Sequence, residues 1–303
     1  MIPTLRAAFE NGHASLGGAI NFSNRTYESN LPYVLRFMVD KDITGCGWVT
    51  LPAGKYRLEE NKSRYISRSQ IEVNIDQKDI IGRDCNNDPM WGKIAPYRIL
   101  SLDIECVAQI GFPTPDRDQV ITIACYGKPH GKSNEIKIVF QLDGCDTIVG
   151  TDLRTFKYER DLLMAFSEFF IEYDPDVITG YNVITFDLHY LIKRAEKLKI
   201  PAFTWGRLKN VKTVMKEGRY LAKAMGMRTT VDINLDGRIQ LDMMIHMMKE
   251  KKLSSYTLNA VSYQFLGEQK EDVQYSIIKD LQNGDDHSRK RIATYCLKDA
   301  ILP

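Results

Sequence analysis

Two carboxylates interrupt a run of residues that otherwise has the pattern of a buried strand. The run is Arg98-Ile-Leu-Ser-Leu-Asp-Ile-Glu-Cys106, and its apolar content predicts a β-strand. Side chains two residues apart on a strand project from the same face, so Asp103 and Glu105 point together and Leu102 and Ile104 pack opposite them. Two acids on one face repel each other, and Mg²⁺ or Mn²⁺, which prefer oxygen ligands, would relieve that repulsion. The alternative is an edge strand whose polar face is solvated.

The pattern around this strand predicts an α/β domain with a mixed sheet. Further strands are expected at residues 119–126, 135–140 and 177–180, a helix whose apolar face includes Leu162 and Phe166 precedes the last of these, and a helix at 187–198 follows it. Three strands, a helix, a strand and a helix in this order are typical of an α/β domain. After Gly237 helices dominate, with starts expected at Ser255 and near Asp286.

The first part of the chain has a different pattern. Residues 1–30 are rich in Gly, Asn and Ser and are expected to form loops, whereas residues 33–39, 47–51 and 71–75 suggest short strands of a small antiparallel unit. A polar stretch at 82–89 is the best candidate for a boundary. We therefore expect a partial β-rich N-terminal domain at residues 1–96, followed by the α/β domain at residues 97–303.

Charge and cysteine content exclude several classes of protein. Forty-one Lys and Arg against 39 Asp and Glu leave a net charge of +2, so any nucleic-acid surface must come from local clustering. The six cysteines have no Cys-x-x-Cys spacing, which favours free thiols in a reducing compartment over a zinc or disulfide framework. No apolar stretch approaches the ~20 residues of a membrane helix, and the N-terminus lacks a signal-peptide pattern. We expect a soluble intracellular protein without membrane contact.

One local cluster of basic residues stands out. Between Arg207 and Arg228 there are seven Lys or Arg residues and one acid, Glu217. Such clusters supply phosphate contacts in nucleic-acid-binding proteins. The alternative is a solvated basic loop.

Two further motifs carry carboxylates. Asn182-Val-Ile-Thr-Phe-Asp187 follows a predicted strand, which places Asp187 at a strand-to-helix junction where ligands commonly bind in α/β sheets. The alternative is that Asp187 caps its helix. Tyr295 and Asp299 are four residues apart and share a helix face, unless the tyrosine is half-buried in a core and the acid is in solvent. Asp242 lies outside these motifs and is interpreted as structural.

The three motifs are more specific together than separately. Asp-x-Glu on a strand, Asn-x-x-x-Phe-Asp after the next βα unit and Tyr-x-x-x-Asp on a late helix resemble, in this order, the 3′→5′ proofreading exonuclease domain of family B DNA polymerases, which has a ribonuclease H-like fold. The family's active-site acids and tyrosine match Asp103, Glu105, Asp187, Asp299 and Tyr295. Stretches at 36–48, 51–56, 174–182, 255–261 and 265–273 are similar to the delta branch of eukaryotic replicative polymerases.

The resemblance runs from about Tyr27 to Pro303 and departs from the family pattern at two positions. His189 replaces an expected proline and Thr185 an expected asparagine. Neither position supplies a catalytic carboxylate. Both could alter how the end of a primer is held.

The resemblance implies a metal-dependent exonuclease. It would hydrolyse the 3′-terminal phosphodiester of DNA and release nucleoside 5′-monophosphates, with two Mg²⁺ or Mn²⁺ ions held by the four acids and the phenol orienting water or phosphate. It also implies a β-hairpin in the basic region, a nuclear location, and DNA primer ends, single-stranded DNA, other polymerase subunits and a sliding clamp as partners. The residues expected to bind nucleic acid are Asn182, Phe186, Lys209, Lys212 and Lys216.

The polymerase motifs and the C-terminal metal-binding cysteines of the family are absent from this chain. The chain stops at Pro303 within an apolar pattern that began near Ile292, so we expect it to be a piece of a longer protein that adds no nucleotides itself. Two other functions stay open. A non-catalytic binding module is disfavoured by the complete set of acids, because binding phosphate requires cations. An exonuclease acting on RNA is disfavoured by the delta-like flanking stretches.

Overall fold

The computed structural model describes residues 2–11, 25–222, 226–268 and 275–303, which fall into two compact units. The N-terminal unit comprises Met1–Arg64 and Ile71–Lys93, and the C-terminal unit comprises Tyr65–Gln70 and Ile94–Pro303. In the C-terminal unit, the Arg68 amide donates to the Arg207 carbonyl at 2.8 Å, which attaches the Tyr65–Gln70 segment. No helix in the described parts of the chain has the length and apolarity to cross a membrane.

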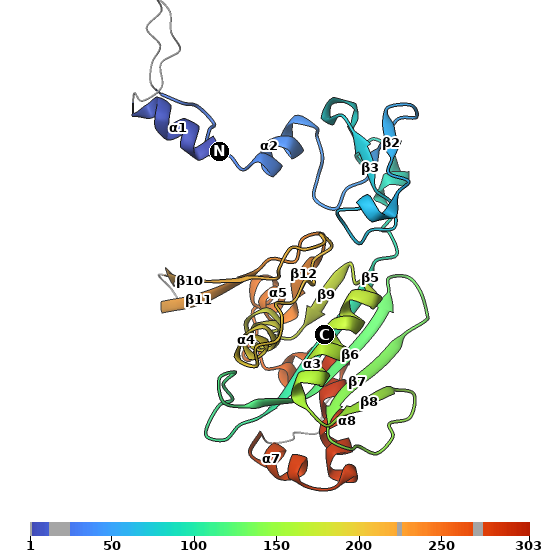
Figure 1. Ribbon diagram of the computed structural model, residues 1–303, viewed down its shortest axis with the longest axis vertical. Helices are drawn as coiled ribbons and strands as arrows, with labels where there is room; N and C mark the ends of the chain where they lie inside the picture. Colours follow the sequence, from blue (N-terminus) through green and yellow to red (C-terminus); the bar gives the residue numbers. More distant parts are fainter. Residues whose placement is uncertain (1, 12–24, 223–225, 269–274) are drawn as a thin grey trace, which may run out of the picture. The chain divides into compact units, whose positions relative to one another are not determined.

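The N-terminal unit contains two short antiparallel strand pairs, as the sequence pattern indicated. β1 (Val49–Thr50) pairs with β4 (Ile81–Gly82), and β2 (Tyr56–Leu58) pairs with β3 (Val73–Ile75). Single 3-10 turns lie at Lys62–Arg64, Gln77–Asp79 and Pro89–Gly92. The unit also contains helices α1 (Ile2–Glu10) and α2 (Tyr33–Asp40) (Figure 1).

Both helices correct expectations from the sequence. The run that starts at Tyr33 was expected to be a strand, but it lacks strict alternation, follows Pro32 and pairs Arg36 with Asp40 one helical turn later at 2.9 Å. Part of the expected loop at 1–30 is also helical, and Arg6 and Glu10 make the same kind of pair in α1. Residues 12–24 of that expected loop lie outside the described residues.

A mixed sheet forms the centre of the C-terminal unit, as predicted. Its six strands within the described residues have the order β12-β9-β5-β6-β7-β8. β5–β6 and β6–β7 are antiparallel, whereas β5–β9, β9–β12 and β7–β8 are parallel. The strands are β5 (Arg98–Val107), β6 (Gln119–Pro129), β7 (Ile136–Leu142), β8 (Asp152–Phe156), β9 (Val177–Gly180) and β12 (Ile239–Asp242).

The helices of this unit pack on both faces of the sheet (Figure 1). They are α3 (Glu159–Tyr173), α4 (His189–Lys197), α5 (Met243–Glu250), α6 (Leu258–Leu266), α7 (Tyr275–Asn283) and α8 (Asp286–Ile301). A β-hairpin of β10 (Met215–Ala222) and β11 (Gly226–Ile233) lies in the basic region, where the resemblance placed one.

Strand alternation decides which helix covers which face. Ile123 and Cys125 of β6 belong to the large core that also contains Phe166 and Phe170 of α3. Ala124, between them, instead packs in a second cluster with Val139 of β7 and residues Ala293, Cys296, Leu297 and Ala300 of α8. Neighbouring strand residues face opposite ways, so α3 and α8 lie on opposite faces. The α8 face is lined by small side chains.

Candidate active site

Asp103 and Glu105 lie on a central strand and face α8. β5 is hydrogen-bonded to β9 on one side and to β6 on the other, so the alternative of an edge strand is wrong. Asp103 is paired with Ala124 and Glu105 with Thr122, which puts both acids on the face that α8 covers. Both side chains are half-buried. The strand therefore holds two carboxylates at a helix–sheet interface.

Asp187 reaches the same strand from the turn after β9. It lies in a π-helical turn, Ile184–Leu188, and only 1% of it is exposed. Its Oδ1 accepts a hydrogen bond from the Ile104 amide at 3.0 Å. That amide is available because the β5–β9 pairing ends at Ser101 and Thr179. The alternative of a helix cap does not hold, because Leu188 occupies the N-cap position of α4.

Close contact between β9 and β5 makes this bond possible. A Cβ atom on Gly180 would lie 2.7 Å from the Leu102 carbonyl oxygen and 2.8 Å from the Val183 Cβ. Such distances are shorter than side chains tolerate, so glycine is required where β9 ends. The turn that carries Asp187 is thereby held directly against β5.

Asp242 supports the same turn, as its structural interpretation proposed. Its carboxylate accepts hydrogen bonds from the Asn182 amide and the Ile184 amide, each at 3.1 Å. It also caps α5 by accepting from the Met244 amide at 3.0 Å. One buried acid thus joins the Asp187 turn to the start of the following helix.

The electrostatics of Asp187 are those of an acid buried beside another acid. Burial and, next, the negative charge of Asp103 raise the pKa of Asp187 well above its usual range. The bond from the Ile104 amide opposes this shift by stabilising the carboxylate. A cation between the two acids would remove the repulsion that raises this pKa.

Helix α8 brings the remaining two predicted residues to the site. Asp299 is only 6% exposed, so the alternative that places it in solvent is wrong. Tyr295 is half-buried, and burial followed by the charges of Asp299, Glu105 and Asp103 raises the pKa of its phenol far above the usual value. The negative charges of the acids on β5 and α8 therefore favour the protonated form of the Tyr295 phenol, which keeps its proton at neutral pH.

Cys296 is a member of this cluster that the motifs did not identify. Burial, followed by the charges of Asp103, Glu105 and Asp299, raises the pKa of its thiol well above the usual range. Its Sγ lies 3.4 Å from Asp103 Oδ2. The sequence feature that could have identified Cys296 is its position next to Tyr295, among the apolar residues of the predicted helix.

The donor chemistry of the site suits hard divalent cations. The four acids offer oxygen ligands, which Mg²⁺ and Mn²⁺ prefer. Among the described residues no group of three or more His, Cys, Asp and Glu side chains forms a ready-made metal cluster. The repulsion that raises the pKa of Asp187 opposes close approach of the acids without a cation. The fit to a metal therefore rests on the type, burial and mutual influence of these acids.

The residues expected to bind a DNA strand lie in two places. Asn182 has a left-handed backbone, with φ of 65°, and its side-chain oxygen accepts a hydrogen bond from the Thr185 hydroxyl within the turn. The Phe186 ring packs against Tyr190 and Phe112, with ring centres 5.7 and 5.5 Å apart. Phe112, which the motifs did not identify, is 73% exposed. Phe186 of the turn and Phe112 of the β5–β6 loop thus form an aromatic pair next to Asp187.

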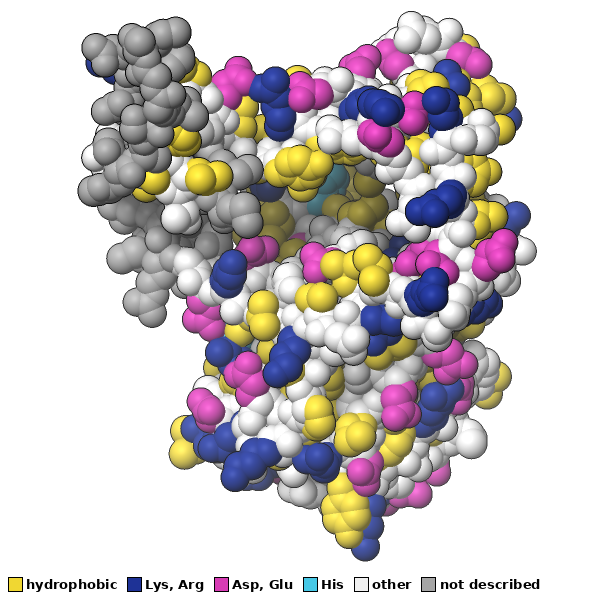
Figure 2. Space-filling model, turned by 45° about the horizontal axis from the view of Figure 1, so that its top comes forward, with side chains coloured by type: hydrophobic (Ala, Val, Ile, Leu, Met, Phe, Trp, Pro, Cys, Tyr) yellow, Lys and Arg dark blue, Asp and Glu magenta, His cyan; other side chains and the backbone are white. Residues whose placement is uncertain are grey.

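The basic segment divides into paired and exposed cations. Arg207 donates to Asp174 Oδ1 at 3.0 Å, so it serves an internal ion-pair network. Lys209 lies over the Tyr65 ring at 5.7 Å, whereas Lys212 and Lys216 are exposed. Lys223 lies outside the described residues. On the face drawn in Figure 2, Lys and Arg side chains alternate with Asp and Glu side chains, in keeping with the small net charge.

The amino-acid sequence is similar to those of known DNA polymerases. The model of the family described as DNA polymerase family B, exonuclease domain, matches residues 24–261. The chain belongs to this family. It is 46% identical to the DNA polymerase delta catalytic subunit of Dictyostelium discoideum, covering 98% of this chain and 27% of that protein. It is 47% identical to the subunit of the same name from Bos taurus, covering 91% of this chain and 25% of that protein.

A solved structure supports the fold. The family B DNA polymerase of Pyrobaculum calidifontis superposes with a TM-score of 0.60 at 24% identity, covering 91% of this chain and 30% of that one. The mixed sheet is thus the ribonuclease H-like α/β fold predicted for this exonuclease domain. Family B exonuclease domains are in general metal-dependent. The chain spans about a quarter of the length of the curated relatives it matches.

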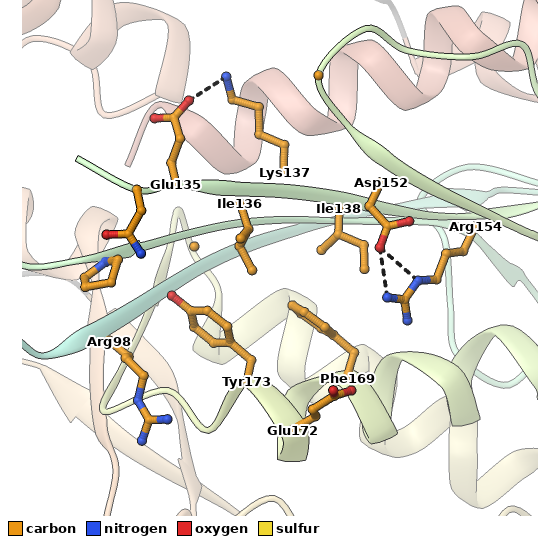
Figure 3. A pocket seen from close by; sticks show the side chains of 14 residues that line it. Arg98, Glu135, Ile136, Lys137, Ile138, Asp152, Arg154, Phe169, Glu172 and Tyr173 are labelled. Atoms are coloured by element: carbon orange, nitrogen blue, oxygen red, sulfur yellow. Dashed lines mark hydrogen bonds and ion pairs between the residues drawn. The ribbon is translucent and has the colours of Figure 1, made fainter. Parts of the chain in front are cut away.

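This exonuclease domain also has a cavity away from its acids. It has a volume of about 640 Å³ and lies between β7, β8 and α3, with Phe169 and Tyr173 on its wall (Figure 3). None of the predicted site residues lines it. Its lining residues include two ion pairs, Glu135–Lys137 at 2.9 Å and Asp152–Arg154 at 2.8 Å. We assign no ligand to this cavity.

Proposed function

We propose that this chain is the proofreading part of a DNA polymerase delta catalytic subunit and removes nucleotides from DNA 3′ ends. The observation that carries the proposal is that Asp103 and Glu105 lie on the face of β5 that α8 covers, while α8 carries Tyr295 and the buried Asp299. Asp187 is hydrogen-bonded to the same strand as the first two acids. Family membership supports the activity, and the delta catalytic subunits among the relatives support the assignment to delta.

The acids are proposed to bind two Mg²⁺ or Mn²⁺ ions. Asp103, Glu105, Asp187 and Asp299 would supply the oxygen ligands for these ions. Bound ions of this kind supply hydroxide near neutral pH and stabilise the attacking and leaving oxygens. The protein's own contribution would be to hold two of these acids on β5, Asp187 against the amide of Ile104 and Asp299 on the helix that covers this face.

Tyr295 is proposed to donate a hydrogen bond. Because its pKa is raised far above neutrality, the phenol keeps its proton and does not act as a base. Its hydroxyl would orient either the attacking water or a non-bridging oxygen of the scissile phosphate. The product would be a nucleoside 5′-monophosphate.

A single-stranded 3′ end is the preferred substrate in this proposal, because a paired end must first be unstacked. Phe186, packed against the exposed Phe112, offers aromatic surface beside Asp187. Asn182 would contact the terminal nucleotide from the same turn. Lys209, Lys212 and Lys216 would contact backbone phosphates at the base of the β10–β11 hairpin.

The wider setting is proposed from the relatives. Within a complete delta-type polymerase the domain would receive mispaired primer ends and work with other polymerase subunits and a sliding clamp. We propose a nuclear location for it. Nucleotide addition would belong to parts of such a polymerase outside this chain.

The test is digestion of a single-stranded DNA that carries a 5′ label. With Mg²⁺ or Mn²⁺ we expect a ladder of products that shorten from the 3′ end, and EDTA should stop it. Immediate release of a labelled mononucleotide, or undiminished activity in EDTA, would contradict the proposal. A matched RNA strand as competitor tests the alternative substrate, since an RNA-directed enzyme would be inhibited far more strongly by RNA than by DNA.

A further inference from the structure

The thiol of Cys296 lies between α8 and the middle of β5. Its Sγ is 3.3 Å from the Asp103 carbonyl oxygen and 3.4 Å from Asp103 Oδ2. The residue is fully buried. A thiol has one hydrogen to donate, so the two oxygens of Asp103 share it. The contact therefore joins a side chain that the motifs overlooked to the backbone and the carboxylate of a predicted metal ligand.

The surrounding packing explains why a small residue occupies this position. Ala293, Cys296 and Ala300 are spaced three and four residues apart, so they form one stripe along α8. The stripe packs on Ala124, which lies directly opposite Asp103, and on Val139. All five side chains are completely buried. A larger side chain would push α8 from the sheet, whereas alanine would fit without offering a donor.

We propose that Cys296 is a positioning residue whose thiol holds the Asp103 carboxylate in the orientation that binds a divalent cation. The inference rests on the proposed function, which makes Asp103 a metal ligand. A neutral donor restrains the rotation of the carboxylate and leaves its charge available to a cation. A lysine or arginine in the same place would instead compete with the cation.

Three variants of the 303-residue chain test this inference. C296A removes the donor, C296S keeps a donor on a side chain of similar size, and C125A removes a buried thiol that packs in the core on the other face of β6. Mn²⁺ binding is followed through the electron paramagnetic resonance signal of the free ion, which requires no nuclease activity. We expect about fivefold weaker binding by C296A, the effect of one net hydrogen bond. C296S should stay within about twofold of the wild type, and C125A should bind as the wild type does.

The outcomes separate positioning from packing. If C296A binds Mn²⁺ as tightly as the wild type, or C125A weakens binding equally, the inference is overturned and Cys296 is a packing residue. If C296A does not fold, C296S decides, because a fivefold loss despite a donor would overturn the inference and retained affinity would support it. A wild-type chain that binds no Mn²⁺ overturns it as well. A chain that binds Mn²⁺ but does not shorten DNA overturns the proposed function and leaves the comparison of variants valid.

Discussion

At the scale of single residues, the charged form of Asp187 is unfavourable in the folded protein when no cation is bound beside it. Its carboxyl group is buried, and both burial and the charge of Asp103 raise its pKa. Folding therefore shifts the equilibrium of Asp187 towards the protonated form, compared with the unfolded chain. Each unit by which the pKa is raised corresponds to about 1.4 kcal/mol between the two protonation states.

This shift gives a pH dependence with a defined sign. Because the folded-state pKa of Asp187 lies above its ordinary value of 3.8, its contribution to stability is complete below that pH and is lost as pH rises through the folded pKa. In EDTA we expect the melting temperature of the wild type to fall relative to that of D187N from about pH 4 upward. Asparagine keeps an oxygen for the Ile104 amide, so the comparison isolates the charge. Parallel curves for the two proteins would show that Asp187 is not perturbed.

The two acids of β5 allow a second prediction. We expect the double variant D103A/E105A to lose cleavage and to melt at the same or a higher temperature without metal, because removing two neighbouring charges relieves repulsion. The control is E168A/E172A, which removes two exposed acids of α3 on the opposite face of the sheet. Nuclease assays and thermal melts in EDTA provide the measurements. Retained cleavage together with a lower melting temperature would assign the two acids a structural role.

At the scale of elements, the strands of the sheet that the apolar pattern predicted are those whose residues are mostly buried. They are β5, β6, β7 and β9, and the core contains side chains such as Leu102, Ile123 and Phe140 from them. β8 and β12 were missed, because most of their residues are not buried and the two strands depend on pairing with β7 and β9. The strand expected from Tyr33 is a helix in which no residue is buried. Its apolar residues therefore do not mark a buried strand.

The sequence supplied candidate residues for the site but not the contacts between them. The spacing of the motifs singled out the acids as candidates, whereas the bond from the Ile104 amide to Asp187 joins residues far apart in the sequence. It depends on where β9 stops pairing, which no local pattern specifies. The same applies to Cys296 and to Phe112, whose partners come from other elements.

The junction between β9 and β5 gives a third prediction. G180A would place a Cβ atom 2.7 Å from the Leu102 carbonyl, so the turn that carries Asp187 must move. We expect a loss of about 1–3 kcal/mol in the free energy of unfolding, measured in urea, together with weaker cleavage. The control is G45A, where a Cβ would have no neighbour within 4 Å. Equal effects of both substitutions would show that the close contact does not matter.

The base of the β10–β11 hairpin gives a fourth prediction. Replacing Lys209, Lys212 and Lys216 with glutamine should weaken binding to single-stranded DNA and flatten its salt dependence. Each lost phosphate contact should reduce the slope of log K against log salt by about 0.7. Cleavage at saturating DNA should change little, because these lysines are not among the residues proposed to bind metal.

The matched control replaces Lys128, Lys132 and Lys157, three exposed lysines on or beside β6 and α3. Binding isotherms at several salt concentrations compare the two triple variants. An unchanged slope for the hairpin variant would support the alternative of a solvated basic segment, because a cation that contacts no phosphate releases no counterion.

At the scale of the whole molecule, the chain contains a family B exonuclease domain and none of the family's polymerase motifs. It spans about a quarter of its curated relatives. We therefore expect no template-dependent extension of a primer by the purified chain. Primer extension is measured with deoxynucleotides and a primer whose 3′ end is recessed on a longer template, and added host polymerase is the positive control. Extension by a preparation free of host polymerase would contradict this prediction.

β5 contributes both side chains and a backbone amide to the site, and this limits the positions at which residues can be inserted in the chain. Side chains of β5 supply two acids, and the Ile104 amide of the same strand holds the third. One residue inserted ahead of Asp103 would exchange the two faces of the strand beyond it and offer Asp187 a different amide. Insertions after Val107 would instead enter the loop that leads to β6 and leave these bonds in place. We therefore expect natural length variation in that loop and constant spacing from the start of β5 to Glu105.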